Sequence, residues 1–97
     1  MSTKLEAIAL RTEVTDDDMK KLRHMLGVAE HRPKKNWGLR NYFAAGAADV
    51  PGLERLVEAG YCVRGAPYMG AHYYHATLAG CAAAGLSKAA AERAFEA

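Results

Sequence analysis

The first clear pattern of apolar and polar positions lies between residues 15 and 27 and has helical spacing. Thr15 precedes three aspartates, so its hydroxyl can cap a free backbone N–H, and Asp18 stands where it can reach back to complete a capping box. Apolar side chains then recur with approximate helical spacing, lysine and arginine interleave on the outer side, and Gly27 supplies a stop. The pattern predicts a first helix that begins after Thr15 and ends at Gly27.

The chain from residue 28 to residue 38 is basic and irregular. Pro33 rules out a continuous helix there, so we expect a loop. Apolar spacing returns with Leu39 and Phe43, which are four positions apart. This spacing predicts a second short helix that runs to Gly46.

A third helix is predicted over residues 50–59. Asp49 is a capping carboxylate, Pro51 has the ring angle of a first helical turn, and Gly60 ends the run. Its apolar stripe consists of Leu53, Leu56 and Val57.

Further along, the pattern changes to a period of two. Residues 61–64 and 72–77 favour strands, and the segment between them contains glycines and a proline, which together predict a β-hairpin. Thr77 then precedes a small-residue segment that predicts a short helix ending near Gly85. Ser87 caps a final helical run to the end of the chain.

Residues 1–14 alternate only weakly and form an N-terminal arm whose structure stays open between a short helix, an edge strand and a loosely ordered segment. Residues 15–97 are predicted to form one domain of the α+β class. Its order of three helices, a two-stranded hairpin and a C-terminal helix resembles a small winged helix-turn-helix domain, in which the hairpin is the wing.

Two phrases carry this resemblance in detail. Residues 53–61, LERLVEAGY, are similar to the end of the third helix and the first wing strand of such domains. Residues 73–80, YYHATLAG, resemble the return strand and the following helix in regulators of the MarR type. We expect Thr77 to cap that helix and Gly80 to permit its close approach. The resemblance implies DNA binding and transcription regulation.

A second similarity concerns the first half of the chain. Residues 22–27, LRHMLG, and residues 40–43, RNYF, are similar to segments of small uncharacterised proteins of bacteriophages and prophages. This similarity implies a source and leaves the mechanism open.

The composition favours a binding domain over an elaborate enzyme. With 97 residues, of which 51% are hydrophobic and 25% charged, the chain supports one modest core and leaves little room for a deep pocket. It lacks the run of about 20 apolar residues that a membrane span needs. Its first residues show no secretory signal. We therefore expect a cytoplasmic protein, in the host cell if it is phage-encoded, with no membrane partner.

The strongest charge feature runs from Lys20 to Arg40, where seven positive residues stand against one negative residue, Glu30. Such a patch, beside Trp37 and Tyr42, is suited to neutralising phosphates and stacking a base. The alternative is a solvated helix face and a charged loop, with the aromatic residues in the core. The candidate nucleic-acid contacts are Arg32, Lys34, Lys35 and Arg40, with Arg64 on the wing.

The third helix favours a different partner. A helix that reads the major groove exposes Arg, Lys, Asn or Gln, whereas residues 49–58 offer three acids and one arginine. The alternative function is therefore a protein-binding accessory factor that modulates or inhibits a host or phage machine, and a virion component is a third. The candidate protein contacts are Arg55, Glu58 and Tyr68. A homodimer through the Ala-rich C-terminal helix also stays open.

The sequence offers no pattern typical of catalysis or metal binding. His72 and His75 are three apart, so on a strand they point to opposite faces. Cys62 and Cys81 have no partner at CxxC spacing, and we expect two reduced, buried thiols. We find no nucleophile motif and no phosphate-binding glycine loop. The prediction is a protein that is not an enzyme, with no catalytic residues, no metal site and no cofactor.

Overall fold

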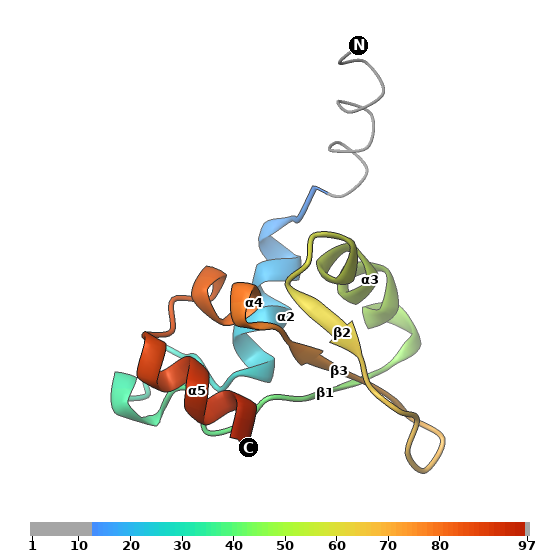
Figure 1. The fold of residues 1–97 in the computed structure, drawn as a ribbon. Coiled ribbons are helices and arrows are strands. Elements are labelled where there is room, and N and C mark those ends of the chain that lie inside the picture. Colours follow the sequence, from blue (N-terminus) through green and yellow to red (C-terminus); the bar gives the residue numbers. More distant parts are fainter. Residues whose placement is uncertain (1–12, 97) are drawn as a thin grey trace.

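The computed structural model describes residues 13–96 of the chain, so most of the predicted N-terminal arm lies outside it. The described residues form an α+β domain with four α-helices and a three-stranded antiparallel sheet (Figure 1). The helices are α2 (Asp16–Met25), α3 (Val50–Glu58), α4 (Leu78–Ala83) and α5 (Lys88–Glu96), and the strands are β1 (Phe43–Ala45), β2 (Cys62–Arg64) and β3 (His72–Ala76). Two short 3₁₀ turns, η1 (Lys34–Asn36) and η2 (Ala47–Asp49), complete the fold.

Helix α2 confirms the predicted first helix. The Asp18 backbone N–H donates to the Thr15 hydroxyl at 3.1 Å, and the Thr15 N–H donates back to the Asp18 carboxylate at 3.1 Å, which is the expected capping box. Gly27 ends the helical segment with a positive φ of 72°. Leu22 and Met25 of this helix are fully buried and belong to the core.

The predicted second helix is wrong, because its residues form β1 instead. Gly38 takes a φ of 83° and lies so close to α5 that a Cβ there would come within 2.5 Å of the Ala90 carbonyl oxygen. The chain then extends, Phe43 pairs with Tyr74 of β3, and Leu39 is 60% exposed. Pairing with a strand about 30 residues away in sequence outweighs the local spacing.

The third helix, the hairpin and the helix after it confirm the predicted elements, but Asp49 makes no side-chain cap on α3 and its carboxylate accepts the Gly46 N–H instead. Strands β2 and β3 pair antiparallel, and the sheet order is β1-β3-β2. Thr77 caps α4 by accepting the Gly80 N–H at 3.0 Å, and its own N–H donates to the Tyr61 carbonyl at 3.0 Å. Gly80 packs directly on the Tyr61 backbone, where a side chain would not fit. The small residues of this segment therefore hold α4 tightly against the start of β2.

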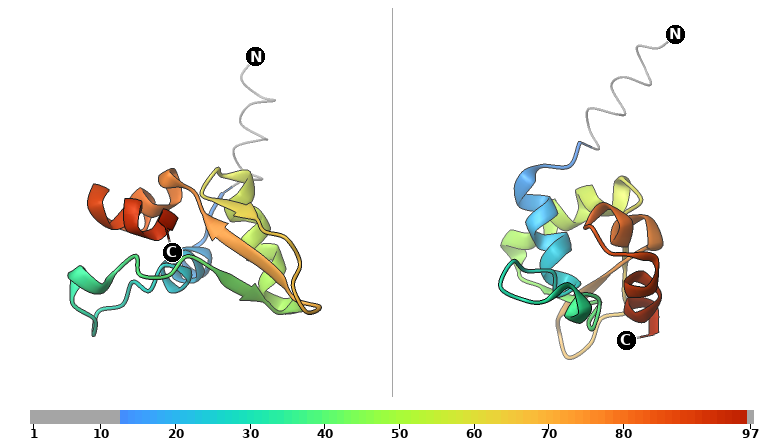
Figure 2. Two further views of the ribbon diagram at one scale, coloured as in Figure 1. Left: turned by 60° about the horizontal axis from the view of Figure 1, so that its bottom comes forward. Right: turned by 90° about the vertical axis from the view of Figure 1, so that its left-hand side faces the viewer.

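The two faces of the sheet have different neighbours. Because side chains alternate along a strand, Phe43, Cys62 and Tyr74 lie on one face and Val63 and Tyr73 on the other. Helices α2 and α3 pack on the first face, which contains the core. In the right-hand view of Figure 2, α5 lies on the side of the sheet opposite to α2 and α3, beside the loop that contains η1. It covers only the end of that face near Ala76.

Candidate nucleic-acid interface

The basic loop, residues 28–40, joins α2 to β1 and is braced by hydrogen bonds. The Trp37 indole N–H donates to the Ala29 carbonyl at 3.2 Å, and Trp37 is half-buried. One guanidinium nitrogen of Arg93 on α5 donates to the Lys35 carbonyl at 3.2 Å and to the Trp37 carbonyl at 2.8 Å. These bonds fix the loop backbone and leave the side chains of Lys34 and Lys35 exposed.

Arg32 and Arg40 come together beside the end of α2. A Cβ on Gly27 would lie 3.4 Å from Arg32 Nη1 and 3.4 Å from Arg40 Cγ, so both side chains border the same glycine. A hollow of about 170 Å³ lies there, and His24 and His31 also line it. The loop therefore gathers two arginines and two histidines around one small concavity.

The predicted cations differ in their partners. Among residues 13–96, no carboxylate oxygen lies within 4.0 Å of the charged nitrogens of Arg32, Lys34, Lys35 or Arg40. Arg64, in contrast, forms a two-bond ion pair with Glu54 of α3, in which its Nε donates to Glu54 Oε2 at 2.9 Å. The structure thus brings Arg32 and Arg40 together, places Lys34 and Lys35 on η1 of the same loop, and pairs Arg64 with Glu54.

The Glu54 carboxylate is held from two strands. The Tyr74 hydroxyl of β3 donates to Glu54 Oε2 at 2.7 Å, beside the Arg64 bonds from β2. Hydrogen bonds from Arg64 and Tyr74 lower the pKa of Glu54, although its burial opposes them. Burial and the Glu54 carboxylate raise the pKa of the Tyr74 hydroxyl to about 12. This network ties α3 to the hairpin.

Arg55, a predicted protein contact, is also engaged within the fold. Its Nε and Nη2 donate to the two carboxylate oxygens of Asp18 at 2.6 and 2.9 Å, and Asp18 is fully buried. Burial alone would raise the pKa of Asp18, but the hydrogen bonds from Arg55 and Thr15 outweigh it and the pKa is lowered. Gly52 is needed here because a Cβ would meet Asp18 Oδ1 at 2.5 Å.

The other two predicted protein contacts remain on the surface. Glu58 is exposed at the end of α3, and Tyr68 is 66% exposed in the hairpin turn, where Met69 is exposed beside it. Arg55 is turned toward Asp18 of α2. Of the three predicted protein contacts, Arg55 is therefore used in an ion pair within the fold. Glu58 and Tyr68 are exposed on different elements.

An open aromatic surface is the feature that the sequence prediction missed. Tyr42, Tyr68, Tyr73 and His75 line a shallow hollow of about 500 Å³ on the sheet face opposite α2 and α3. The ring centres of Tyr42 and Tyr73 are 6.2 Å apart, and the Arg40 guanidinium carbon lies 4.6 Å from the Tyr42 ring centre. The signal was the pair Tyr73-Tyr74, since consecutive strand residues point to opposite faces. We call Tyr42, Tyr68 and Tyr73 the aromatic surface below.

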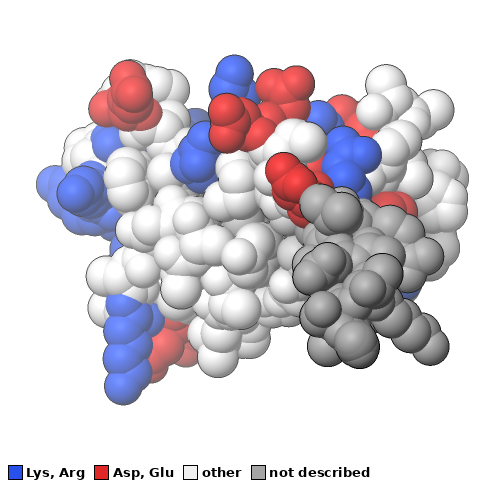
Figure 3. All heavy atoms as spheres, turned by 90° about the horizontal axis from the view of Figure 1, so that it is seen from above, with Lys and Arg blue, Asp and Glu red and all other residues white. Residues whose placement is uncertain are grey.

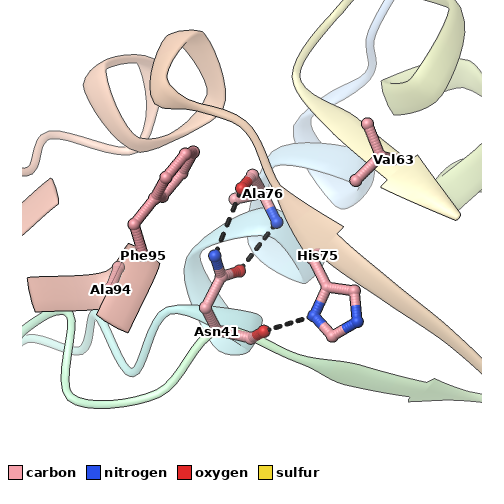
Figure 4. Close-up of a pocket in the computed structure, with 6 residues that line it drawn as sticks. All are labelled: Asn41, Val63, His75, Ala76, Ala94 and Phe95. Atoms are coloured by element: carbon pink, nitrogen blue, oxygen red, sulfur yellow. Dashed lines mark hydrogen bonds between the residues drawn. The ribbon is translucent and has the colours of Figure 1, made fainter. Parts of the chain in front are cut away.

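A second hollow on the same face, of about 310 Å³, separates α5 from the sheet (Figure 4). The Asn41 amide donates to the Ala76 carbonyl at 3.2 Å and accepts the Ala76 N–H at 2.7 Å. His75 Nδ1 lies 2.7 Å from the Asn41 carbonyl oxygen, so this nitrogen carries the proton and donates. Phe95 lies on the α5 side. These polar groups are used to hold β1 against β3.

Charge on the rest of the surface is mixed. Seen from above, toward α4, a broad uncharged area is bordered by lysine and arginine interspersed with acids (Figure 3). Residues 65–86 contain no charged side chain. The basic loop carries four cations and one acid, Glu30, and none of the four forms an ion pair with a carboxylate among residues 13–96.

Cys62 and Cys81 are both buried and both free. Burial, with the Cys81 thiol nearby, raises the pKa of Cys62 to about 12, and burial also raises the pKa of Cys81, so both are poor nucleophiles at neutral pH. Within residues 13–96, no three His, Cys, Asp or Glu side chains are grouped to hold a metal ion. None of the four helices described here has the length and apolar character needed to cross a membrane.

Comparison with protein-family models, with curated proteins and with solved structures gave no match for this chain. Its function is therefore inferred from its own surface.

Proposed function

We propose that this protein binds nucleic acid in a regulatory role through the basic loop. Arg32, Lys34, Lys35 and Arg40 are the proposed phosphate contacts. The observation that carries the proposal is that these four cations have no carboxylate partner among the described residues, on a loop braced by Trp37 and Arg93. Unpaired cations on a fixed backbone neutralise phosphates and release counterions, which is the main source of sequence-independent affinity.

The finer fold that we propose is a variant of the winged helix. Its support is the β2–β3 hairpin, the sheet order β1-β3-β2 and the helix that Thr77 caps after the hairpin. The variant has two α-helices, α2 and α3, before the hairpin, where the winged helix-turn-helix resemblance implies three. The exposed acid Glu58 and the ion-paired Glu54 and Arg55 make α3 unsuited to reading base edges. We therefore propose contacts to phosphates and not a sequence-reading helix.

We also propose that the protein acts in the cytoplasm of a phage- or prophage-bearing cell. This part depends only on the similarity of residues 22–27 and 40–43 to phage proteins.

Binding of labelled random-sequence DNA, single-stranded and duplex, at several salt concentrations tests the proposal. We expect salt-sensitive binding that is weakened for every sequence alike by the double variant Lys34→Glu/Lys35→Glu. Loss of two phosphate contacts is expected to flatten the plot of log affinity against log salt by about two units.

The matched control is Lys20→Glu/Lys21→Glu, which changes the net charge equally on α2, where Lys20 lies 4.0 Å from Asp17. An equal loss in both double variants would show that general charge and not the loop binds DNA. No binding at low salt would favour a protein partner, for which Tyr68 in the hairpin turn is the exposed candidate.

A further inference from the structure

The open face of the sheet has a composition that the phosphate contacts do not explain. The pairing of β1, β2 and β3 places Ala44, Val63, Tyr73 and His75 on this face, away from the core. Helix α5 covers the end near Asn41 and Ala76, as Figure 4 shows. The part toward the hairpin turn is left to Tyr42, Tyr68 and Tyr73.

The aromatic rings are available for contact. Tyr42 is 46% exposed and Tyr68 is 66% exposed, and Tyr73, which lines the same hollow, is half-buried. The hollow is wide and shallow, so it accepts a flat group more readily than an enclosed side chain. Tyrosine rings on a sheet are the usual platform on which proteins stack unpaired bases.

The aromatic surface is continuous with the basic loop. Arg40 stacks on Tyr42 with its guanidinium carbon 4.6 Å from the ring centre, and it also borders the hollow that Arg32 lines. Asp49 lines the adjoining hollow with Arg40 and Tyr42, and its carboxylate accepts the Gly46 N–H at 3.1 Å. A ligand that follows this path meets cations and then aromatic rings, which is complementary to a backbone of phosphates carrying flat bases.

We infer that the aromatic surface binds single-stranded nucleic acid by stacking its bases, while Arg40 and Arg32 contact its phosphates. This inference rests on the proposed function and names its ligand class. A duplex is a poorer ligand, because the flat faces of its bases are covered by their neighbours. By analogy with other sheet platforms, about two or three bases fit.

The test compares three probes of equal length: a dT12 strand, a 12-residue abasic deoxyribose-phosphate strand, and a 12-base-pair duplex. We expect the protein to bind dT12 at least about tenfold more tightly than the abasic strand, which has the phosphates without the bases. The variant Tyr42→Leu/Tyr73→Leu is expected to lose about tenfold or more on dT12 and little on the abasic strand. The control Tyr42→Phe/Tyr73→Phe keeps the rings and is expected to bind dT12 as the native protein does.

The outcomes separate this inference from the proposed function. Equal binding of dT12 and the abasic strand, with a loss on both in Lys34→Glu/Lys35→Glu, overturns base stacking and leaves phosphate binding intact. Binding of none of the three probes at low salt overturns both. If light scattering shows a dimer that the leucine variant dissociates, the aromatic surface is an interface between two copies and the inference is wrong. Thermal melts of each variant establish that it is folded.

Discussion

Tyr73 and Tyr74 are neighbours on β3, yet they lie on opposite sides of the sheet and have different surroundings. Tyr74 is 4% exposed, packs in the core beneath α2 and α3, and donates its hydroxyl to Glu54. Tyr73 is half-buried on the open face, with its ring near Tyr42. Residue type alone therefore does not separate a structural tyrosine from one that is free to contact a ligand. The strand pairing makes that distinction.

The positively charged residues also fall into two groups, those with a structural partner and those without one. On the covered side, Arg55 and Arg64 each form two hydrogen bonds to a carboxylate, Asp18 and Glu54 respectively. In the basic loop, none of the four cations forms an ion pair with a carboxylate of residues 13–96. Consequently the formal net charge of +2 understates the positive charge that the loop can direct at a ligand.

The largest expected effect is the difference in stability between variants of Tyr74 and Tyr73. Tyr74→Ala removes a buried ring and the hydroxyl bond to Glu54, so we expect the free energy of unfolding to fall by about 3–4 kcal/mol. Tyr73→Ala, and Val63→Ala on the same open face, should each cost less than about 1 kcal/mol. Urea unfolding of the three variants measures this. Equal losses at positions 73 and 74 would mean that the two faces are assigned incorrectly.

The local part of the fold could be predicted from sequence because its signals lie within a few residues. Thr15 and Asp18 are three positions apart, as are Thr77 and Gly80, and each pair forms the hydrogen bonds expected of a helix start. The hairpin likewise depended on two short runs and the turn between them.

The missed features depend on residues far apart in sequence. Strand β1 is stabilised by β3, about 30 positions later, and Asp18 is 37 positions from Arg55. No local pattern contains these partners. Charge density indicated the candidate phosphate contacts, with Tyr42 beside them, but the aromatic surface as a whole was missed because the predicted helix ending at Gly46 gave Tyr42 the wrong neighbours.

The second expected effect is a loss of stability at acidic pH. The folded-state pKa values of Asp18 and Glu54 are both lowered, so these carboxylates stabilise the fold above their unfolded pKa values, about 4. That stability is lost as the pH falls through the lower folded-state values. We therefore expect the free energy of unfolding to decrease steadily from about pH 5 toward pH 2.

The variant Asp18→Asn isolates one of the two groups. At pH 7 we expect a loss of about 2 kcal/mol, since the ion pair across α2 and α3 is broken while an amide oxygen can still accept a hydrogen bond. Below about pH 4 the gap to the native protein should narrow, because Asp18 of the unfolded chain then binds a proton while the folded carboxylate, with its lowered pKa, still keeps its charge. Denaturant unfolding across this pH range measures both values. A gap that stays constant would show that Asp18 contributes through packing and not through its charge.

The smallest expected effect is on stability, and it comes from removing the Asn41 side chain, which joins the segment before β1 to the end of β3. Asn41 uses its side-chain amide to pair with both the N–H and the carbonyl of Ala76, two positions beyond the pairing of β1 with β3 (Figure 4). Asn41→Ala removes both bonds, but the adjacent hollow of about 310 Å³ gives water access to the freed groups. We expect a loss of about 1 kcal/mol and faster hydrogen exchange of the Ala76 amide.

The exchange pattern decides what Asn41 does. If it only fastens the start of β1, the amides that join β2 to β3 keep their native exchange rates, since that pairing does not involve Asn41. The variant Asn41→Asp is the matched control, because it keeps an acceptor for the Ala76 N–H and loses the donor to the Ala76 carbonyl. Its Ala76 amide should therefore exchange more slowly than in Asn41→Ala. Faster exchange throughout β3 in both variants would instead mean that the covered and open faces depend on Asn41 together.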